Sequence, residues 1–229
     1  MGIFGFTTTK TPLFNTRDLT SLFKAPLGLD SQFLLRPLET ILFPKSLLTI
    51  KETFGNILAV ESDDYPSSKP LYVDRRFIIE TETPRRSLRM LPKASILKER
   101  LISYPKLPYV WGGNTRSGIP EIFSYYPPQK SLSPYEWLSW HFRGVDCSGL
   151  LYDVSNGTTP RNTKELSEFG YEVTSPKPLD IIVWPGHVLI FLDKNHLIES
   201  KVGDGVTFSK AKDRLKELEK IPYQIRRWV

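Results

Sequence analysis

The sequence contains a single cysteine, Cys147, and this scarcity excludes several kinds of chemistry. One thiol forms no internal disulfide, and it supports neither paired-thiol redox chemistry nor a metal site built from several cysteines. Cys147 is therefore a small packed side chain, a chance occurrence or a nucleophile.

Long apolar runs are also absent. No segment approaches the ~20 consecutive apolar residues of a transmembrane helix, so no membrane span is expected. Residues 1–20 include Lys10 and Arg17 but no apolar stretch of the length that a signal peptide needs. These observations favour a cytoplasmic location, with the periplasm or secretion by an unusual route as the alternative.

Neither sign of charge forms a dense block. The 31 Lys and Arg residues are scattered among 25 Asp and Glu residues, for a net charge of +6. Zinc-finger spacing, RNA-binding sheet signatures and basic heptad helices are missing, so no nucleic-acid partner is expected. The 40% apolar content is typical of a globular protein, and a monomer with one large core or two small ones is expected.

The first part of the chain predicts a small β-barrel. Residues 1–32 hold short apolar clusters broken by prolines and are interpreted as an irregular N-terminal extension. Residues 33–92 predict a small β-barrel, because several short apolar runs alternate with turn residues. A linker containing Arg85 and Arg86 follows at 81–89, and the predicted strands cover 40–43, 46–51, 56–61, 70–73 and 76–80.

The second part, residues 93–229, predicts an α+β domain in which helices precede strands. Apolar periodicity indicates three helices and a set of short strands, with one charged helix before the last strand. The expected helices are 94–102, 147–154, 162–169 and 209–220, and the expected strands are 181–184, 188–192, 197–200 and 223–228.

Cys147 lies immediately before an apolar-periodic segment, within Asp146-Cys147-Ser148-Gly149. Its side chain is therefore expected at a helix N-terminus, where unpaired amides and the helix dipole favour a thiolate. The same amides are suited to the oxyanion of a tetrahedral intermediate. The alternative is a small buried hydrophobic residue, although the polar neighbours are unusual for a plain core position.

A thiolate nucleophile needs a base that also protonates the leaving amine, and histidine is best suited to both steps near neutral pH. Of the three histidines, His187 follows Gly186 and opens the apolar run 188–192, at the start of a buried strand. The alternative is a strand-end histidine bonded to a loop carbonyl. His196 is expected in a solvated turn, and His141 in an aromatic loop.

The strand after His187 carries a candidate partner, Glu199. If residues 193–195 form the turn, Leu192 faces His196, and His187 then lies diagonal to Glu199 on one face. Glu199 is then placed to accept from the imidazole and to set its tautomer. A two-residue turn reverses this pairing and leaves Glu199 as a solvated strand residue.

A further cluster, Tyr109-Val110-Trp111-Gly112-Gly113, combines aromatic residues with adjacent glycines. Adjacent glycines permit positive φ or close backbone approach, as in a loop beside a cleft. A tight turn over a core tryptophan is the alternative.

Taken in order, these motifs resemble the NlpC family of papain-fold cell-wall peptidases. The resemblance covers roughly residues 100–229 and also includes Pro160-Arg161-Asn162-Thr163 and the closing segment 225–229. It implies a papain-like α+β catalytic domain, and it identifies the preceding β-barrel of residues 33–92 as similar to bacterial SH3-like modules. It also implies hydrolysis of the bond between γ-linked D-glutamate and diaminopimelate in peptidoglycan stem peptides. The expected partner is thus a peptidoglycan or muropeptide substrate, and no metal or organic cofactor is required.

The resemblance also implies roles for individual residues. Cys147 attacks, His187 exchanges the proton, and Glu199 stands at the third, orienting position. Asp146, Ser148 and Tyr109 are expected to hold the free amine of an N-terminal L-alanine. The remaining expected substrate-binding residues are Trp111 and Gly186.

Three features depart from the family pattern. The third position is Glu199, where the family more often has His, Asn or Gln, and a carboxylate favours the imidazolium. Leu179-Asp180 replaces the usual Gly-Asp, and an aromatic insertion spans residues 114–145. The insertion either walls the cleft or packs as a structural flap on the barrel. An amidase or acyltransferase on the same fold, or a non-catalytic wall-binding protein, are the functional alternatives.

Overall fold

The computed structural model describes residues 3–84 and 87–229, which form two compact units. The first unit contains the chain up to Leu88 together with Val110–Gly144, and the second contains Arg89–Tyr109 and Val145–Val229. The first of these segments ends at Leu88, whereas the sequence analysis placed a domain boundary at 92/93. Val110–Gly144, which the sequence analysis placed in the second domain, lie in the first unit. The basic pair of the predicted linker, Arg85-Arg86, lies outside the described residues.

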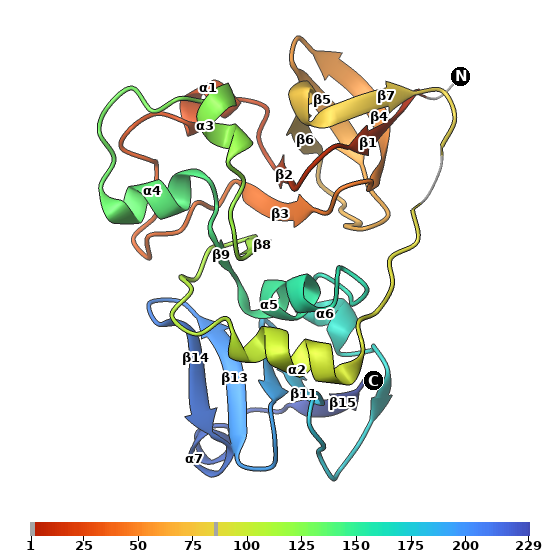
Figure 1. Ribbon diagram of the computed structural model, residues 1–229, viewed down its shortest axis with the longest axis vertical. Helices are drawn as coiled ribbons and strands as arrows, with labels where there is room; N and C mark the ends of the chain where they lie inside the picture. The colour runs from red at the N-terminus through yellow and green to blue at the C-terminus, as the bar shows by residue number, and fades with distance from the viewer. Residues whose placement is uncertain (1–2, 85–86) are drawn as a thin grey trace. The chain divides into compact units, whose positions relative to one another are not determined.

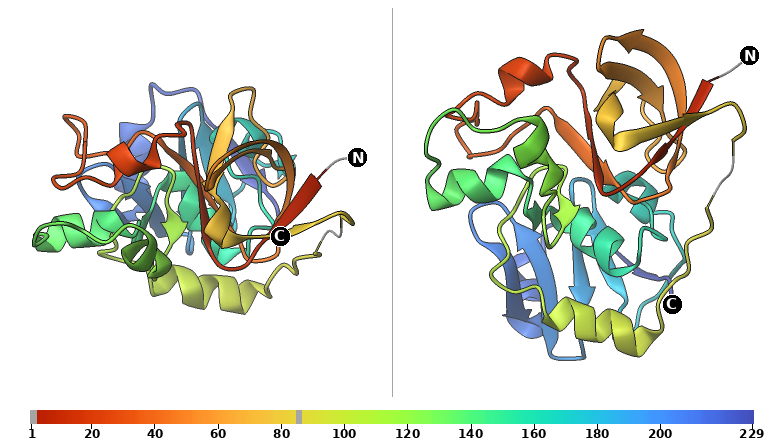
Figure 2. Two further views of the ribbon diagram at one scale, coloured as in Figure 1. Left: turned by 90° about the horizontal axis from the view of Figure 1, so that it is seen from above. Right: turned by 45° about the horizontal axis from the view of Figure 1, so that its top comes forward.

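The first unit is built on a seven-stranded antiparallel sheet with the order β3-β2-β6-β5-β4-β1-β7 (Figure 1). Its middle strands, drawn in orange, curve strongly in both views of Figure 2. The strands are β1 (Ile3–Thr7), β2 (Thr11–Phe14), β3 (Leu38–Leu42), β4 (Leu47–Phe54), β5 (Ile57–Glu61), β6 (Leu71–Asp74) and β7 (Ile78–Thr81), with a single 3₁₀ turn, η1 (Arg75–Phe77), before β7.

The interpretation of residues 1–32 as an irregular extension is wrong. Strand β1 lies between β4 and β7, and β2 lies between β3 and β6, so both are internal strands. Their short length and the presence of Gly5 and Pro12 hide them in the sequence. Gly5 is needed for packing, because a Cβ there would lie 2.4 Å from the side chain of Ile78.

The predicted closed SH3-like barrel is not found. In the part of the chain that the structure describes, β3 and β7 are the two edges of the sheet, and no pairing joins them. The strand predictions within 33–92 were nevertheless correct in number and order, because each apolar run forms one of the strands β3 to β7.

The aromatic insertion packs into the core of the first unit. Ile119, Ile122, Trp140 and Phe142 share one hydrophobic cluster with residues of the sheet. The structure therefore confirms the packing alternative for the insertion, and any part in substrate choice stays a prediction. Its short helices are α3 (Glu121–Tyr125) and α4 (Pro134–Trp140), its ends pair as β8 (Asn114–Thr115) and β9 (Gly144–Val145), and α1 (Leu19–Leu22) belongs to the same unit.

The second unit is an antiparallel sheet with the order β10-β15-β11-β12-β13-β14, and helix α5 packs on β12 and β13. This arrangement of helices and an antiparallel sheet confirms the α+β prediction. The helices are α2 (Ala94–Ile102), α5 (Cys147–Val154), α6 (Thr163–Leu166) and α7 (Ala211–Glu217), and the strands are β10 (Tyr171–Glu172), β11 (Ile181–Trp184), β12 (His187–Phe191), β13 (His196–Lys201), β14 (Gly205–Lys210) and β15 (Gln224–Arg227).

The two faces of this sheet carry different helices. Val188, Ile190 and Ile198 face the cluster that contains α5, whereas Leu189 and Phe191 face the cluster that contains α7. Strand side chains alternate between faces, so each strand of the hairpin contributes to both cores. Strand β14, which the sequence analysis missed, completes the hairpin with β13.

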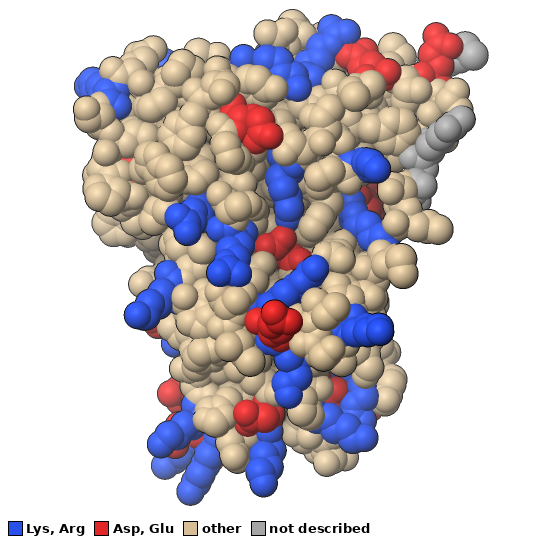
Figure 3. Space-filling view, viewed as in Figure 1, with Lys and Arg blue, Asp and Glu red and all other residues tan. Residues whose placement is uncertain are grey.

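None of the described helices combines the length and the apolar character that a membrane crossing requires. Figure 3 shows Lys and Arg side chains interspersed with Asp and Glu over the visible face. The scattered charge expected from the sequence is therefore also seen on this surface.

Candidate active site

Helix α5 begins at Cys147, as the sequence predicts. Asp146 caps the helix, because its Oδ1 accepts a hydrogen bond from the amide of Gly149 at 2.6 Å. A capping carboxylate satisfies one of the unpaired amides of a helix start. Cys147 and Ser148 are the first two helical residues, so their amides have no acceptor within the helix.

The Cys147 sulfur lies against the start of strand β12. Its thiol donates to the carbonyl oxygen of Gly186 over 3.9 Å, and the backbone amide of Val188 also interacts with it. Gly186 and Val188 are the two neighbours of His187 in the chain. The structure therefore brings the single thiol to the backbone segment that carries the predicted base.

The resting state of the thiol differs from the expectation. Burial is the largest cause, and together with the negative charge of Asp146 it raises the pKa of the Cys147 thiol to about 12, against the opposing effect of Arg161. Cys147 is only 7% exposed. The expected thiolate is therefore not the resting form, because desolvation outweighs the favourable position at the helix start.

His187 and Glu199 form the predicted pair. The β12–β13 hairpin pairs Ile190 with Ile198 and Phe191 with Leu197, which is the register that a turn at 193–195 produces. The count places His187 and Glu199 diagonally on one face, and His187 Nε2 lies 2.8 Å from Glu199 Oε2. The centroids of the Trp184 and His187 rings lie 5.0 Å apart.

The other two histidines lie outside this pair. His196 is exposed as expected, but it is the first residue of strand β13 and not a turn residue, and its Nδ1 lies 3.0 Å from the carboxylate of Asp193. His141 belongs to the aromatic part of the insertion and packs 4.4 Å from the Trp137 ring. Neither residue belongs to the His187–Glu199 pair.

A residue that the sequence analysis missed, Arg214, completes the pair from helix α7. Its Nε and Nη2 donate to the two oxygens of Glu199 at 2.8 and 3.0 Å. Burial raises the pKa of Glu199, but hydrogen bonds from His187 and Arg214 outweigh this and lower it overall. Glu199, 1% exposed, is therefore an ionised carboxylate at neutral pH.

Arg161 explains one part of the motif at residues 160–163. Its guanidinium donates to both oxygens of Asp146, at 3.0 and 2.6 Å, and to Ser148 Oγ at 2.8 Å. The ion pair is almost fully buried, and removal of one partner of such a pair typically costs about 3–5 kcal/mol. The Arg161 guanidinium thus joins Asp146 to Ser148, and Asp146 Oδ1 also accepts from Ser148 Oγ and from the Gly149 amide.

Thr163 explains another part of the motif. Its Oγ1 accepts from the Gly186 amide at 3.2 Å, which holds the turn before His187. Gly186 has φ +90, a backbone conformation that residues other than glycine rarely adopt. Gly186 lies beside Cys147, and its carbonyl oxygen accepts from the thiol.

The two remaining predicted substrate-binding residues lie in different units. Tyr109 is half-buried in the second unit, whereas Trp111 belongs to the first unit, where the Arg36 guanidinium stacks 4.4 Å above its ring. Gly112 has φ +68, and a Cβ there would lie 2.6 Å from the Leu38 carbonyl oxygen. The close backbone approach predicted for the adjacent glycines is confirmed.

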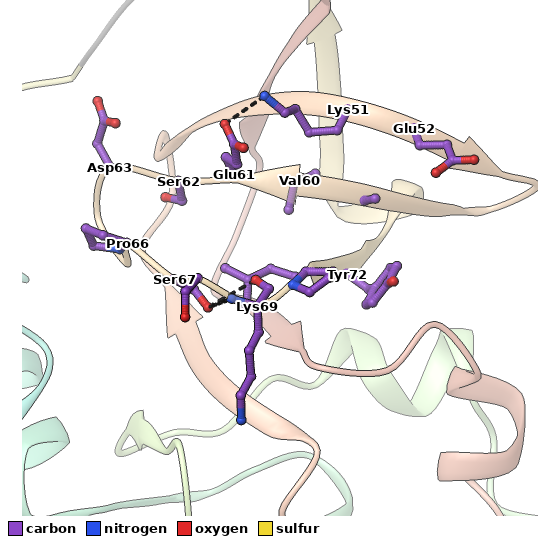
Figure 4. A pocket seen from close by; sticks show the side chains of 14 residues that line it. Lys51, Glu52, Val60, Glu61, Ser62, Asp63, Pro66, Ser67, Lys69 and Tyr72 are labelled. Carbon is purple, nitrogen blue, oxygen red and sulfur yellow. Dashed lines mark hydrogen bonds and ion pairs between the residues drawn. The ribbon is translucent and has the colours of Figure 1, made fainter.

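A separate hollow of about 610 Å³ lies in the first unit, between β4, β5, β6 and the loop that joins β5 to β6 (Figure 4). Its lining combines polar and apolar residues, and two of them, Lys51 and Glu61, form an ion pair at 2.9 Å. No histidine or cysteine lines it, so it lacks the nucleophile chemistry of the Cys147 site. Across residues 3–84 and 87–229, no cluster of His, Cys, Asp and Glu side chains is arranged to bind a metal.

The sequence matches the NlpC/P60 family over residues 106–219. This range includes Cys147, His187, Glu199 and Arg214. Comparison with curated proteins gave no significant match.

Several solved structures are similar to the chain at low sequence identity. An NlpC/P60 family protein from Bacillus cereus is 16% identical with a TM-score of 0.41, over 99% of this chain and 63% of that protein. The chain therefore spans less than two thirds of that protein. RipD from Mycobacterium tuberculosis, described as a non-catalytic NlpC/P60 domain protein with a peptidoglycan-binding function, is 21% identical with a TM-score of 0.40, over 58% of this chain and 95% of RipD. NlpC1 from Trichomonas vaginalis is 13% identical with a TM-score of 0.40, over 99% of this chain and 69% of that protein.

Proposed function

We propose that the chain is a cysteine peptidase of bacterial cell-wall peptides, because residues 106–219 match the NlpC/P60 family. The substrate we propose is the bond between γ-linked D-glutamate and diaminopimelate in peptidoglycan stem peptides. One observation carries the proposal: the Cys147 thiol contacts the backbone on both sides of His187, and His187 is bonded to Glu199.

The ionised Glu199 determines which imidazole nitrogen acts as the base. A carboxylate only accepts hydrogen bonds, so His187 Nε2 carries the proton and Nδ1 has the free lone pair. As Cys147 Sγ attacks the carbonyl carbon, Nδ1 takes the thiol proton. Proton removal in the attack step suits a thiol whose pKa lies near 12.

The second half of the reaction releases both products. The amides of Cys147 and Ser148 at the start of α5 stabilise the oxyanion of the tetrahedral intermediate. The imidazolium protonates the departing amine of diaminopimelate, which leaves a thioester on Cys147. Water then attacks the thioester carbon and gives its proton to His187. The C–S bond breaks to release the D-glutamyl carboxylic acid, and His187 returns the proton to the Cys147 sulfur.

The preference for a free N-terminal L-alanine is part of the proposal. Asp146, Ser148 and Tyr109 are its expected ligands, and Asp146 Oδ2 accepts a hydrogen bond from Arg161 Nη2 at 2.6 Å. A substrate amine would share this oxygen with the guanidinium. N-acetylation of the substrate removes the amine charge and is therefore expected to weaken cleavage.

The decisive experiment incubates L-Ala-γ-D-Glu-diaminopimelate with the wild type and with Cys147→Ala, followed by mass spectrometry. We expect the wild type to release diaminopimelate and the variant to be slower by at least about 10⁴-fold. Release by both proteins, or by neither, contradicts the proposal. The N-acetylated tripeptide tests the amine preference, and an added amine acceptor that appears in the product indicates an acyltransferase.

A second candidate is a non-catalytic cell-wall-binding domain, favoured by the buried thiol with its raised pKa. In that case the tripeptide binds but stays intact. Equilibrium dialysis of the labelled tripeptide against wild type and Cys147→Ala separates the candidates, because binding without cleavage by either protein supports this one.

A further inference from the structure

The imidazole of His187 is oriented by two side chains that act together, Glu199 and Arg214. Glu199 Oε2 lies 2.8 Å from His187 Nε2 and 3.0 Å from Arg214 Nη2, while Oε1 accepts from Arg214 Nε at 2.8 Å. One carboxylate thus joins the imidazole from strand β12 to the guanidinium from helix α7. Bidentate pairs of this kind are among the strongest hydrogen-bonded contacts in proteins.

Burial makes this arrangement necessary for an ionised Glu199. The Glu199 side chain is 1% exposed and that of Arg214 is 15% exposed. A carboxylate with such burial and only a neutral imidazole for a partner would take up a proton, because charge is costly away from water. Arg214 supplies the compensating positive charge, and its remaining nitrogen Nη1 donates to the exposed Glu217 at 2.6 Å.

The protonation state of Glu199 decides the tautomer of His187. An ionised Glu199 requires a donor at Nε2, which leaves Nδ1 free to accept. A protonated Glu199 instead donates to Nε2, and the neutral imidazole then carries its proton on Nδ1. In that tautomer His187 has no lone pair for the Cys147 thiol.

We propose that Arg214 is a positioning residue that keeps Glu199 ionised and thereby holds His187 in the tautomer that acts as a base at Nδ1. This inference rests on the proposed peptidase function for its catalytic consequence. The Glu199–Arg214 pair has no net charge, so the two side chains together provide a neutral polar partner for the imidazole.

The first test measures kcat/KM for the tripeptide against pH. Arg214→Met is expected to lose about 10- to 100-fold near pH 6. Its acid limb moves to higher pH, since loss of the guanidinium raises the pKa of Glu199, and protonation then occurs at higher pH. Arg214→Lys keeps the charge and is expected to retain most of the activity at neutral pH, and Glu217→Gln serves as the matched control with a wild-type profile.

A rescue experiment distinguishes positioning from general structural damage. The double variant Glu199→Gln with Arg214→Met restores a neutral acceptor beside His187, and it is expected to recover at least about 10-fold relative to Arg214→Met. An Arg214→Met variant with an unchanged pH profile, or a double variant no better than that single variant, overturns the inference.

A second readout requires no substrate. Nitrogen-15 NMR of the histidine side chains distinguishes Nε2–H from Nδ1–H, and the His187→Gln spectrum assigns the His187 signal among the three histidines. We expect Nε2–H in the wild type and a shift towards Nδ1–H in Arg214→Met near pH 6. If no protein cleaves the tripeptide but this shift occurs, the proposed function fails while the positioning role stands. If the wild type cleaves the tripeptide but Arg214→Met shows no tautomer shift, the proposed function stands and the positioning role of Arg214 fails.

Discussion

At the residue scale, burial and the position at a helix start have opposite effects on the pKa of the Cys147 thiol. The helix start stabilises a thiolate, but burial and the neighbouring Asp146 raise the pKa of the thiol to about 12. An acid with a raised pKa stays protonated to higher pH, so little thiolate exists at neutrality. The reaction therefore depends on His187 to remove the proton as the sulfur attacks.

Alkylation of Cys147 should accordingly be slow near neutral pH. At pH 7.5 we expect iodoacetamide to react with the folded chain at least about 100-fold more slowly than with the chain unfolded in urea, whose thiol has an ordinary pKa of about 8.5. The rate should continue to rise up to about pH 10, because the thiolate fraction grows with pH. The single cysteine makes mass spectrometry an unambiguous measurement. Rapid alkylation that is constant below pH 7 would show a resting thiolate.

Leu179 adopts a backbone conformation that is unusual for leucine, and its buried contacts explain why the chain tolerates it. The resemblance expects glycine at this position, and Leu179 adopts φ +77, in the region that glycine enters without strain. Its side chain is buried in the core of the second unit, and its carbonyl accepts from Trp228 Nε1 at 2.7 Å. Burial and this hydrogen bond offset the cost of the conformation.

At the element scale, the β12–β13 hairpin is the part of the site that the sequence predicts best. A turn at 193–195 sets the register, and the two-residue period of strands then places His187 and Glu199 on one face. Arg214 could not be found in this way. It reaches Glu199 from a helix fifteen residues further along the chain, and the charged segment that carries it has no feature that singles out one arginine.

Helix α4 provides a test of how the aromatic insertion contributes to stability. Trp140 is fully buried and donates to the Tyr126 carbonyl at 2.9 Å, whereas Trp137 on the same helix is 44% exposed. Trp140→Ala should therefore lower the free energy of unfolding by about 3–5 kcal/mol. Trp137→Ala, the matched control, should change it by less than about 1 kcal/mol.

Urea unfolding monitored by circular dichroism measures both changes. Equal effects of the two substitutions would mean that the insertion is not integrated in the core of the first unit. A much larger effect of Trp140→Ala would establish that residues 114–145 stabilise the sheet.

At the scale of the whole molecule, each unit is assembled from two separate segments. The chain forms the first sheet, contributes Arg89–Tyr109 to the second unit, returns as Val110–Gly144 to the first, and then completes the second. Each unit has its own hydrophobic cores. Segments that share a core are expected to unfold together, even when they are distant in sequence.

Hydrogen exchange in low concentrations of urea should reveal this division. Amides of α4 are expected to exchange in the same step as those of β2 and β3, and amides of α2 in the same step as those of α5 and β12. Mass spectrometry of peptic peptides resolves these segments. If α4 exchanged together with α5 instead, the division of the chain into these two units would be wrong.

The sequence by itself determined the local features of this protein. The helix start at Cys147, the strands on either side of residues 193–195 and the order of most elements follow from patterns within a few residues. The reason is that the spacing of apolar residues, the capping residues and the turn residues each influence structure within a short stretch of the chain. For the same reason His187 and Glu199 could be paired by counting.

Only the tertiary structure decided features that depend on distant segments. The place of β1 and β2 inside the sheet, the packing of residues 110–144 in the first unit and the contact of Arg214 with Glu199 all join parts of the chain that no local pattern connects. The protonated state of Cys147 belongs with them. A pKa reflects burial and neighbouring charge, and both exist only once the chain has folded around the sulfur.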